Sequence, residues 1–181
     1  MNKIKIIALF GKSGAGKDTI QKMMLEQNNN YHKIISCTTR PPRDYEKDGI
    51  DYYFINEEEF ATKVISGSML EATVFRNWFY GTPIESLDPD KTNIGVFNIN
   101  GIETLLDDSR LDVYPIYVQA SDKIRLLRSL NREEDPDCAE ICRRYATDEE
   151  DFRNITFDYK IFNNDKDYSD LTQKMIDDKI L

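Results

Sequence analysis

The sequence predicts an α/β fold in which a parallel β-sheet is flanked by helices. The first observation is an apolar run at 4–10, typical of a buried strand, that leads directly into a glycine-rich loop at 11–16. The second is a helix-compatible segment at 17–27, which a run of asparagines brings to an end. The third is that short apolar runs and helix-like segments alternate again further along the chain. Such alternation favours a parallel sheet with crossover helices.

The later part of the chain contains the second set of alternating segments. Short apolar runs at 94–99 and 113–118 predict strands, and the polar segment at 101–110 between them is compatible with a helix. Another short apolar run at 159–162 predicts a last strand. We expect a closing helix over 167–180, where apolar residues recur at helical spacing.

Two regions do not fit the alternation. Residues 34–82 are rich in aromatic and charged side chains, contain a Pro-Pro pair and an Asp-Gly turn signal, and include a helix-like stretch near 57–66. This region is typical of an inserted lobe. Residues 121–154 are charged and helical in character, and Pro136 interrupts them.

Composition limits the possible functions. The 181 residues are the length of one domain, and 24 Lys plus Arg against 33 Asp plus Glu give a formal net charge of −9. This surplus of negative charge would repel a phosphate backbone or an anionic lipid surface, so we expect neither nucleic-acid binding nor membrane binding. The apolar opening run is too short to span a bilayer and no cleavage site follows it, so nothing indicates secretion. Three cysteines and one histidine cannot form a complete set of disulfides or a structural zinc site, which favours a cytoplasmic protein.

A phosphate-binding motif follows the first predicted strand. The sequence from Gly11 to Lys17 fits G-x-x-x-x-G-K between a strand and a helix, the setting in which backbone N–H groups and a helix N-terminus bind phosphate. Lys17 would neutralise charge on the β- and γ-phosphates. A plain glycine-rich turn is the alternative. The residues expected to bind ATP here are Gly11, Ser13, Gly14, Ala15, Gly16, Lys17, Asp18 and Thr19.

Asp18 stands where this motif usually has a Ser or Thr that contacts Mg²⁺. A carboxylate is a hard oxygen ligand, and the Thr19 hydroxyl comes directly after it, so both residues are candidates for binding Mg²⁺. The alternative is that Asp18 only stabilises the helix N-terminus.

Arg40 and Arg43 flank the Pro-Pro pair. Their planar guanidinium groups suit a phosphate monoester, and the stiff turn between them would hold them in a fixed relative position. They are therefore candidates for binding a phosphorylated acceptor. The alternative is an ordinary pair of surface salt bridges.

Several blocks in order resemble the guanylate kinase family over nearly the whole chain. After the phosphate loop they are Ser36-Cys37-Thr38-Thr39-Arg40-Pro41-Pro42-Arg43, Asp48-Gly49-Ile50-Asp51-Tyr52-Tyr53-Phe54, Leu70-Glu71-Ala72, Tyr80-Gly81-Thr82, the arginines between 128 and 144, and Asp158-Tyr159-Lys160-Ile161-Phe162-Asn163-Asn164-Asp165. The resemblance implies a single kinase domain at 1–181. Its core would comprise 1–34, 83–124 and 146–181, with a monophosphate-binding lobe at 35–82 and a helical lid at 125–145.

The resemblance also implies roles for individual residues. Those implied to bind the acceptor phosphate are Arg40, Arg43, Tyr52 and Tyr80, and those implied to face a guanine base are Ser36, Glu71 and Thr82. A carboxylate at Glu71 can accept the N1–H and amino protons of guanine, which adenine does not present. Asn100 is assigned to the acceptor site and Asn163 to the ATP site. The catalytic residues implied are Lys17, Arg40, Arg128, Arg132 and Arg144.

Asn98 and Asn100 depart from the family pattern, which has two aspartates at this spacing. On the predicted strand at 94–99 these alternating residues would point the same way. Amides lack the charge of carboxylates, so metal binding and base selectivity are expected to differ here. Asp18 is a candidate for restoring the missing negative charge.

Arg128 and Arg132 are spaced i, i+4, which places them on one face of a helix. Arg144 lies beyond Pro136, where a second helix could bring it back to the same site. Such arginines would neutralise charge on a transferred phosphoryl group. The alternative is a solvated helical face with salt bridges.

These observations together predict ATP- and Mg²⁺-dependent phosphoryl transfer to a nucleoside monophosphate, GMP or dGMP. Two alternatives remain open: an inactive guanylate-kinase-like module that binds proteins, and a kinase of the same fold with another phosphorylated acceptor, such as a sugar phosphate. The sequence leaves the oligomeric state open.

Overall fold

The computed structural model describes residues 3–44, 46–75, 77–132, 134–153 and 159–164. The helix expected over 167–180 lies outside these ranges. Among the described residues, none of the helices combines the length and the apolar character that crossing a membrane requires.

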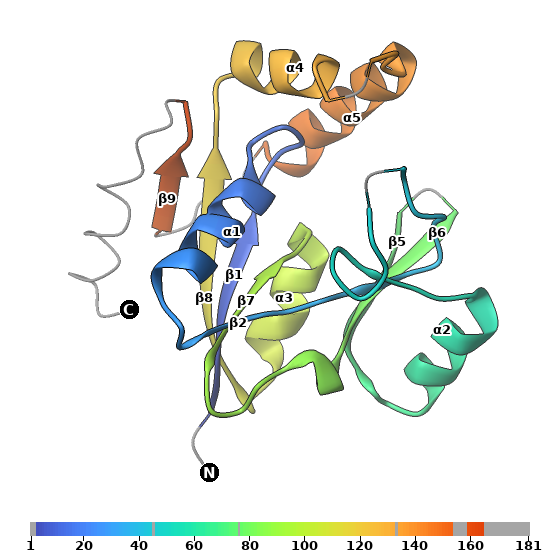
Figure 1. The fold of residues 1–181 in the computed structure, drawn as a ribbon, viewed down its shortest axis with the longest axis vertical. Helices are drawn as coiled ribbons and strands as arrows, with labels where there is room; N and C mark the ends of the chain where they lie inside the picture. Colours follow the sequence, from blue (N-terminus) through green and yellow to red (C-terminus); the bar gives the residue numbers. More distant parts are fainter. Residues whose placement is uncertain (1–2, 45, 76, 133, 154–158, 165–181) are drawn as a thin grey trace.

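A five-stranded sheet forms the centre of the molecule, in the order β2-β7-β1-β8-β9, and every neighbouring pair is parallel. The parallel sheet predicted from the alternating pattern is therefore confirmed (Figure 1). Its strands are β1 (Ile4–Phe10), β2 (Tyr31–Lys33), β7 (Thr92–Val96), β8 (Leu111–Gln119) and β9 (Tyr159–Phe162).

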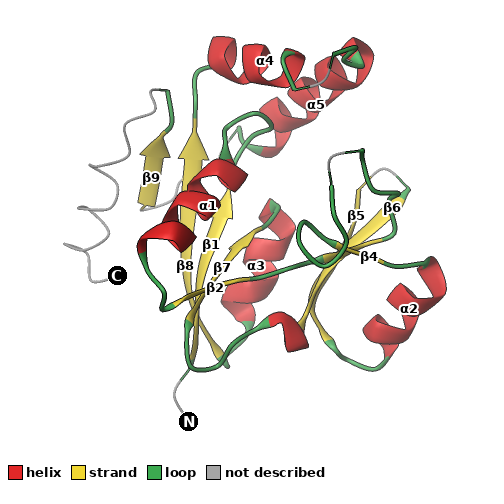
Figure 2. Ribbon diagram, viewed as in Figure 1, coloured by secondary structure: helices red, strands yellow, loops and turns green. Residues whose placement is uncertain are grey.

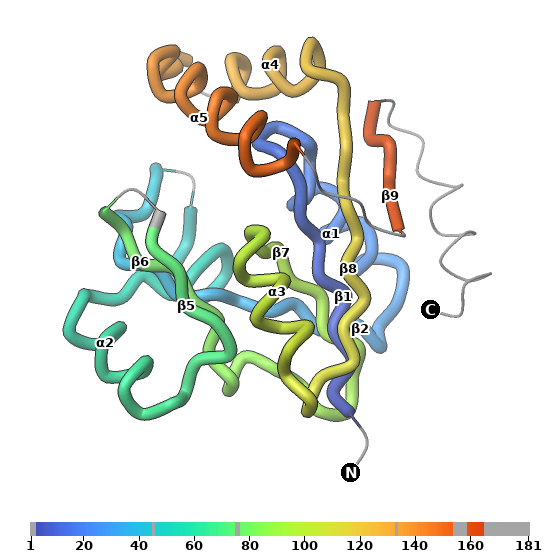
Figure 3. The backbone as a smooth tube through the Cα atoms, turned by 180° about the vertical axis from the view of Figure 1, so that it is seen from behind, coloured from blue at the N-terminus to red at the C-terminus, as the bar shows by residue number. Residues whose placement is uncertain are grey.

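Helices cover both faces of this sheet. Side chains of β1 alternate between the faces: Ile7 and Leu9 pack with Ile20 of α1 (Lys17–Gln27). Ile6, Ala8 and Phe10 pack in the second core cluster with two buried residues of α3 (Ile99–Asp107), Ile102 and Leu105. In Figure 3, seen from behind, α3 lies in front of the sheet. Burial of β1 from both sides fixes the position of the phosphate loop that follows it.

A smaller, four-stranded sheet stands beside the core, in the order β4-β3-β6-β5 (Figure 2). The sheet lies within the region expected to be an inserted lobe, and α2 (Glu57–Ile65) packs on it. Asn56 and Glu59 form a reciprocal capping box that starts α2. The strands are β3 (Cys37–Thr38), β4 (Tyr53–Phe54), β5 (Met69–Phe75) and β6 (Trp78–Pro83), and the short 3₁₀ turn η1 (Ile84–Ser86) follows them.

Helices α4 (Asp122–Leu130) and α5 (Cys138–Asp151) lie beyond the carboxyl ends of β1 and β8 (Figure 1). Pro136 is in the connection between them. Because α4 ends at Leu130, Arg132 follows the helix, and the expected i, i+4 pairing of Arg128 with Arg132 on one helical face is wrong. The Asn131 N–H donates to the Leu127 carbonyl oxygen and so closes the last turn of α4.

The strand expected over 94–99 ends earlier, at Val96. The side chain of Asn98 accepts a hydrogen bond of 2.7 Å from the Gly101 N–H and so caps the N-terminus of α3. The expectation that Asn98 and Asn100 point the same way from a strand is therefore wrong. An asparagine side chain can accept a hydrogen bond from a nearby backbone N–H in place of a strand partner. Here that bond caps a helix at a position where the alternating pattern predicted a strand.

Candidate functional site

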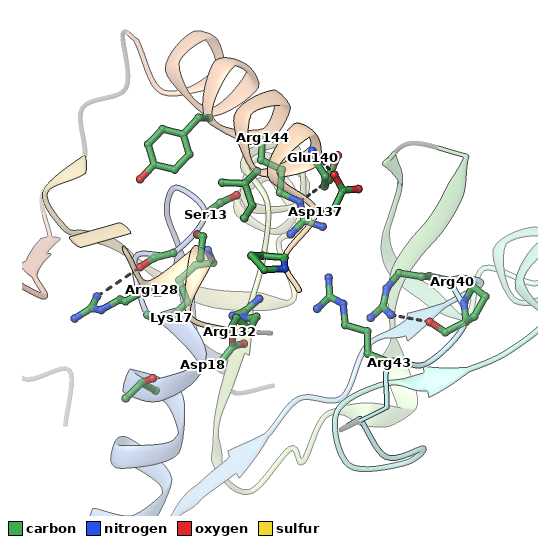
Figure 4. Close-up of a pocket in the computed structure, with 18 residues that line it drawn as sticks. Ser13, Lys17, Asp18, Arg40, Arg43, Arg128, Arg132, Asp137, Glu140 and Arg144 are labelled. Carbon is green, nitrogen blue, oxygen red and sulfur yellow. Dashed lines mark hydrogen bonds and ion pairs between the residues drawn. The ribbon is translucent and has the colours of Figure 1, made fainter. Parts of the chain in front are cut away.

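A cavity of about 770 Å³ lies between the phosphate loop, the loop that follows β3 and the α4–α5 pair (Figure 4). Figure 4 shows Arg40 and Arg43 on one side of it and Lys17 and Asp18 on the other. The volume is in the range of sites for nucleotide-sized ligands. Sequence-predicted residues that line it are Ser13, Gly14, Gly16, Lys17, Asp18, Thr19, Arg40, Arg43, Arg128, Arg132 and Arg144.

The phosphate loop needs glycine at two positions for different reasons. Gly14 and Gly16 both have positive φ angles, of 75° and 89°. A Cβ at Gly14 would lie 2.6 Å from the backbone oxygen of Arg125 in α4. A Cβ at Gly16 would lie 2.3 Å from Nδ2 of Asn163, whose amide donates to the Ala15 carbonyl at 2.7 Å. The loop is thus packed tightly from two sides, by α4 and by Asn163.

Lys17 lies against the beginning of the loop. Its ammonium group donates to the carbonyl oxygens of Gly11 at 2.9 Å and Lys12 at 3.2 Å. Burial lowers the pKa of Lys17 below the usual value for lysine; the negative charges of Asp18 and Asp148 oppose part of this shift, and the weaker effects of Arg132 and Arg125 add to it. A bound anion would oppose this lowering, so the position favours a phosphate.

Asp18 and Thr19 lie in the first turn of α1 and are exposed at the cavity wall. They offer one carboxylate and one hydroxyl. In the part of the chain that the structure describes, no group of three or more His, Cys, Asp or Glu side chains could hold a metal ion. Mg²⁺ in nucleotide sites takes one or two protein oxygens and completes its shell with phosphates and water. This donor set fits that kind of site.

The two arginines flanking the Pro-Pro pair share one carboxylate, Glu46. Arg40 contacts Glu46 at 2.9 Å and Arg43 contacts it at 3.6 Å. Burial alone would raise the pKa of Glu46, but the hydrogen bonds from Arg40 and from the Arg43 backbone outweigh it and lower the pKa. The shared carboxylate holds the two guanidinium groups near each other, where both could meet an incoming phosphate.

Tyr52 and Tyr80 lie beside this arginine pair. Their rings meet edge to face with centroids 6.2 Å apart, and the Arg40 guanidinium lies 5.7 Å from the centre of the Tyr52 ring. Burial raises the pKa of Tyr52 to about 12, and the charge of Asp18 acts in the same direction. Tyr52 therefore remains a neutral hydroxyl that can donate to a phosphate oxygen.

The three residues expected to face a base lie together. Thr82 donates its hydroxyl proton to Glu71 at 2.7 Å, and Ser36 lies 3.0 Å from the Thr82 oxygen. Since the single proton of Thr82 is used, Ser36 is the donor in the second contact. Burial raises the pKa of Glu71, and hydrogen bonds from Thr82 oppose part of the rise.

Neither of the amides at 98 and 100 lines the cavity described above. Asn98 also donates to the Thr73 hydroxyl at 2.9 Å, which links the start of α3 to β5. Asn100 is exposed in the first turn of α3. A Cβ at Gly101 would lie 3.4 Å from Oε2 of Glu71, so the Glu71 carboxylate lies against this helix N-terminus.

Arginines of the α4–α5 region line the cavity on the side formed by these helices. Arg128 donates to the carbonyl oxygens of Ala15 at 3.3 Å and Asn163 at 3.0 Å. Arg144 donates to Glu140 at 2.6 Å, and burial, followed by the charge of Arg43, lowers the pKa of Arg144. The structure thus brings arginines from both sides of the cavity within electrostatic reach of each other.

One important residue was missed by sequence reasoning. Arg125 fits the pattern of a solvated helical face, yet its side chain is only 1% exposed and contacts the phosphate loop. Spacing within α4 does not distinguish it from its neighbours, because its burial comes from packing against the loop and α5.

The chain is similar to known proteins over nearly its whole length. A family model described as guanylate kinase matches residues 3–178. A guanylate kinase of Wolbachia pipientis wMel is 35% identical over 170 residues, covering 91% of this chain and 84% of the relative. A guanylate kinase of Latilactobacillus sakei is 29% identical over 170 residues, covering 91% and 83%.

A solved structure supports the fold. The crystal structure of guanylate kinase from Anaplasma phagocytophilum superimposes with a TM-score of 0.69 at 21% identity, covering 98% of this chain and 85% of the other. At this identity the likeness concerns the fold alone.

Proposed function

The chain belongs to the guanylate kinase family, and we propose that it transfers the γ-phosphoryl group of ATP to GMP or dGMP with Mg²⁺ as the cofactor, giving ADP and the nucleoside diphosphate. Family membership makes it a nucleoside monophosphate kinase. The choice of guanine, the donor and the metal are the proposed parts.

The main support for the proposal is that two separate sets of groups suited to phosphate face one cavity. The phosphate loop with Lys17 forms one wall, and the Arg40–Arg43 pair forms the opposite wall. A single-nucleotide site needs only one such group. Two of them in one cavity suit a donor and an acceptor phosphate that meet in the middle.

The lobe at 35–82 would hold the monophosphate. Tyr52, Tyr80 and the two arginines would bind its phosphate, and Glu71 would accept the N1–H and amino protons of guanine. The contact from Thr82 orients the Glu71 carboxylate. An adenine base presents no such pair of donors, so it would leave the buried carboxylate with Thr82 but without a donor from the base, which is costly.

The segment at 125–145 would act as the lid over the donor phosphates. Arg128, Arg132 and Arg144 would neutralise the equatorial oxygens of the transferred group. Asn163, which holds the Ala15 carbonyl, would support the ATP side of the loop. Closing the lid would also exclude water, which prevents hydrolysis of ATP.

In the transfer itself, an oxygen of the acceptor phosphate attacks the γ-phosphorus, and the bond to the β–γ bridging oxygen breaks. The acceptor oxygen is already anionic, so no strong general base is required. Lys17 would stabilise charge on the β- and γ-oxygens. When bound, Mg²⁺ would supply further charge neutralisation between these phosphates, and Asp18 and Thr19 are the residues that would hold it.

A coupled assay of ADP formation tests the proposal. ATP and Mg²⁺ are supplied with GMP, dGMP, AMP, CMP or UMP in turn, and the Glu71→Ala variant is run in parallel. Turnover confined to guanine nucleotides and lost in the variant supports the assignment. Turnover of another base would reject the guanine site. No turnover in folded protein would favour a different acceptor or a protein-binding module.

A further inference from the structure

Ser13, inside the phosphate loop, has both of its backbone polar groups bonded to one ion pair. The Asp148 carboxylate accepts from the Ser13 N–H at 2.7 Å, and Nε of Arg125 donates to the Ser13 carbonyl at 2.9 Å. Arg125 and Asp148 themselves are 2.8 Å apart. These three residues form a closed ring of hydrogen bonds. Because Arg125 belongs to α4 and Asp148 to α5, the ring joins both helices to the loop.

The ring is shielded from solvent. The Arg125 side chain is 1% exposed and that of Asp148 is 14% exposed. Arg125 also donates to Asp122 at 2.8 Å, and its guanidinium carbon lies 4.4 Å from the centroid of the Tyr145 aromatic side chain. A guanidinium held through several of its donors has one defined orientation, unlike an exposed pair. Loss of Asp148 would leave the Arg125 charge to Asp122 and to Glu149, which lies 3.6 Å away, but it would remove the acceptor that joins Arg125 to the Ser13 N–H.

Neighbouring contacts strengthen the same junction. Glu149, next to Asp148, forms an ion pair with Lys12, next to Ser13. Two consecutive acids of α5 therefore hold two consecutive residues of the loop. On the other side, the absence of a side chain at Gly14 lets the α4 backbone approach the loop directly.

The ring also stands in a fixed relation to the arginines of the cavity. Arg128 is three residues after Arg125 in α4, and Arg144 is four residues before Asp148 in α5, so each lies about one helical turn from a ring member. Both arginines line the cavity. The ring therefore connects the phosphate loop to the two helices that carry these arginines.

We propose that Arg125 and Asp148 are a positioning pair that sets the phosphate loop and the cavity arginines in register for phosphoryl transfer; this rests on the proposed function. Neither side chain would touch the substrates. Both act through Ser13 on the loop and through their own helices on Arg128 and Arg144. Displacement of catalytic groups by about 1 Å can cost about 100-fold in rate.

The test compares four variants with the wild-type chain. Asp148→Asn keeps the size and an acceptor oxygen but removes the charge, Arg125→Lys keeps the charge but loses the planar fork, and Arg125→Met removes both. The double variant Arg125→Met/Asp148→Asn completes a cycle. Matched controls are Arg110→Met and Asp108→Asn, which break an exposed ion pair outside the cavity.

For Asp148→Asn and Arg125→Met we expect kcat to fall by about 100-fold and the Kd of ATP to rise by about tenfold, while KM for the acceptor stays within about twofold. The double variant should be no worse than either single one, and Arg125→Lys should recover part of kcat. A merely structural role would reduce the folded fraction but leave kcat per folded molecule unchanged, and that result would overturn the proposal.

The two proposals can fail separately. If the wild-type chain turns over an acceptor and the variants keep its kcat, the positioning role is wrong and the function stands. If the wild-type chain turns over no monophosphate, the proposed function is wrong. Calorimetric titration with ATP and Mg²⁺ then tests the positioning role. A larger Kd of ATP in the single variants, with changes in binding free energy that do not add in the double variant, supports the role, and an unchanged Kd overturns it.

Discussion

The Thr82 hydroxyl donates to the Glu71 carboxylate at 2.7 Å, and both side chains are buried between the smaller sheet and the start of α3. Burial of an acid is unfavourable to its charged form, so the pKa of Glu71 is raised. The residue proposed to select guanine is therefore also a cost to stability at neutral pH.

We expect the Glu71→Gln variant to be more stable than the wild-type chain at neutral pH. The folded-state pKa of Glu71 lies above its unfolded value, so the folded state binds more protons in this range and stability falls as pH rises through the folded pKa. Glutamine keeps the oxygen that accepts from Thr82. Thermal unfolding from pH 4 to pH 7 should show a gap in Tm that widens with pH. A gap that stays constant would contradict this account.

Replacing Lys17 should abolish the stabilisation that ATP gives. Lys17→Met removes the charge but keeps an unbranched side chain of similar reach. At about 100 times its Kd, ATP with Mg²⁺ should stabilise the wild-type chain by about 2.7 kcal/mol, a rise in Tm of about 5 to 10 °C. The variant should show a rise below about 2 °C under the same conditions. An equal rise in both would mean that ATP binds elsewhere.

Asp18 is expected to contribute to Mg²⁺ binding. The Asp18→Ser variant should need about tenfold more Mg²⁺ for half-maximal phosphoryl transfer, because a charged oxygen ligand is lost. Asp18→Asn is the matched control, since it keeps the size and an oxygen donor without the charge. Titration of activity with Mg²⁺ measures the effect. Full activity and unchanged Mg²⁺ dependence in Asp18→Ser would remove Asp18 from the metal site.

Asn98 should matter for stability through its cap on α3. Asn98→Ala should cost about 1 kcal/mol of unfolding free energy, because the Gly101 N–H loses its partner. Asn98→Asp should be nearly neutral, since both residues are good N-caps. Denaturation in urea measures the unfolding free energy of both variants. Thr73→Val removes only the second contact of Asn98, its hydrogen bond to the Thr73 hydroxyl, and so separates that contribution from the cap. Equal stability of the Ala and Asp variants would show that the cap contributes little.

The sequence predicts features that depend on local order. The strand, the glycine loop and the helix at Lys17 follow from apolar runs, turn residues and spacing, and all three are present in the structure. The cluster of Ser36, Glu71 and Thr82 was expected only from the resemblance, because three separate segments meet in it.

The errors occurred where a residue has more than one possible role. The alternating pattern placed Asn98 on a strand. In the structure the strand has already ended, and Asn98 caps the helix that follows, a role that the alternating pattern does not distinguish from a strand position. Arg125 resembled its exposed neighbours, and only the approach of the loop and α5 buries it. Tertiary contacts of this kind leave no periodic signal in the sequence.

Whether the chain phosphorylates GMP with ATP is best tested by identifying the products of one reaction mixture. ATP, Mg²⁺ and GMP are incubated with the wild-type chain, and nucleotides are separated and quantified at intervals. We expect equal amounts of ADP and GDP, formed by the wild-type chain and lost in Lys17→Met. ADP formed with phosphate and no GDP, or GMP left unchanged by folded protein that binds ATP, would contradict this expectation.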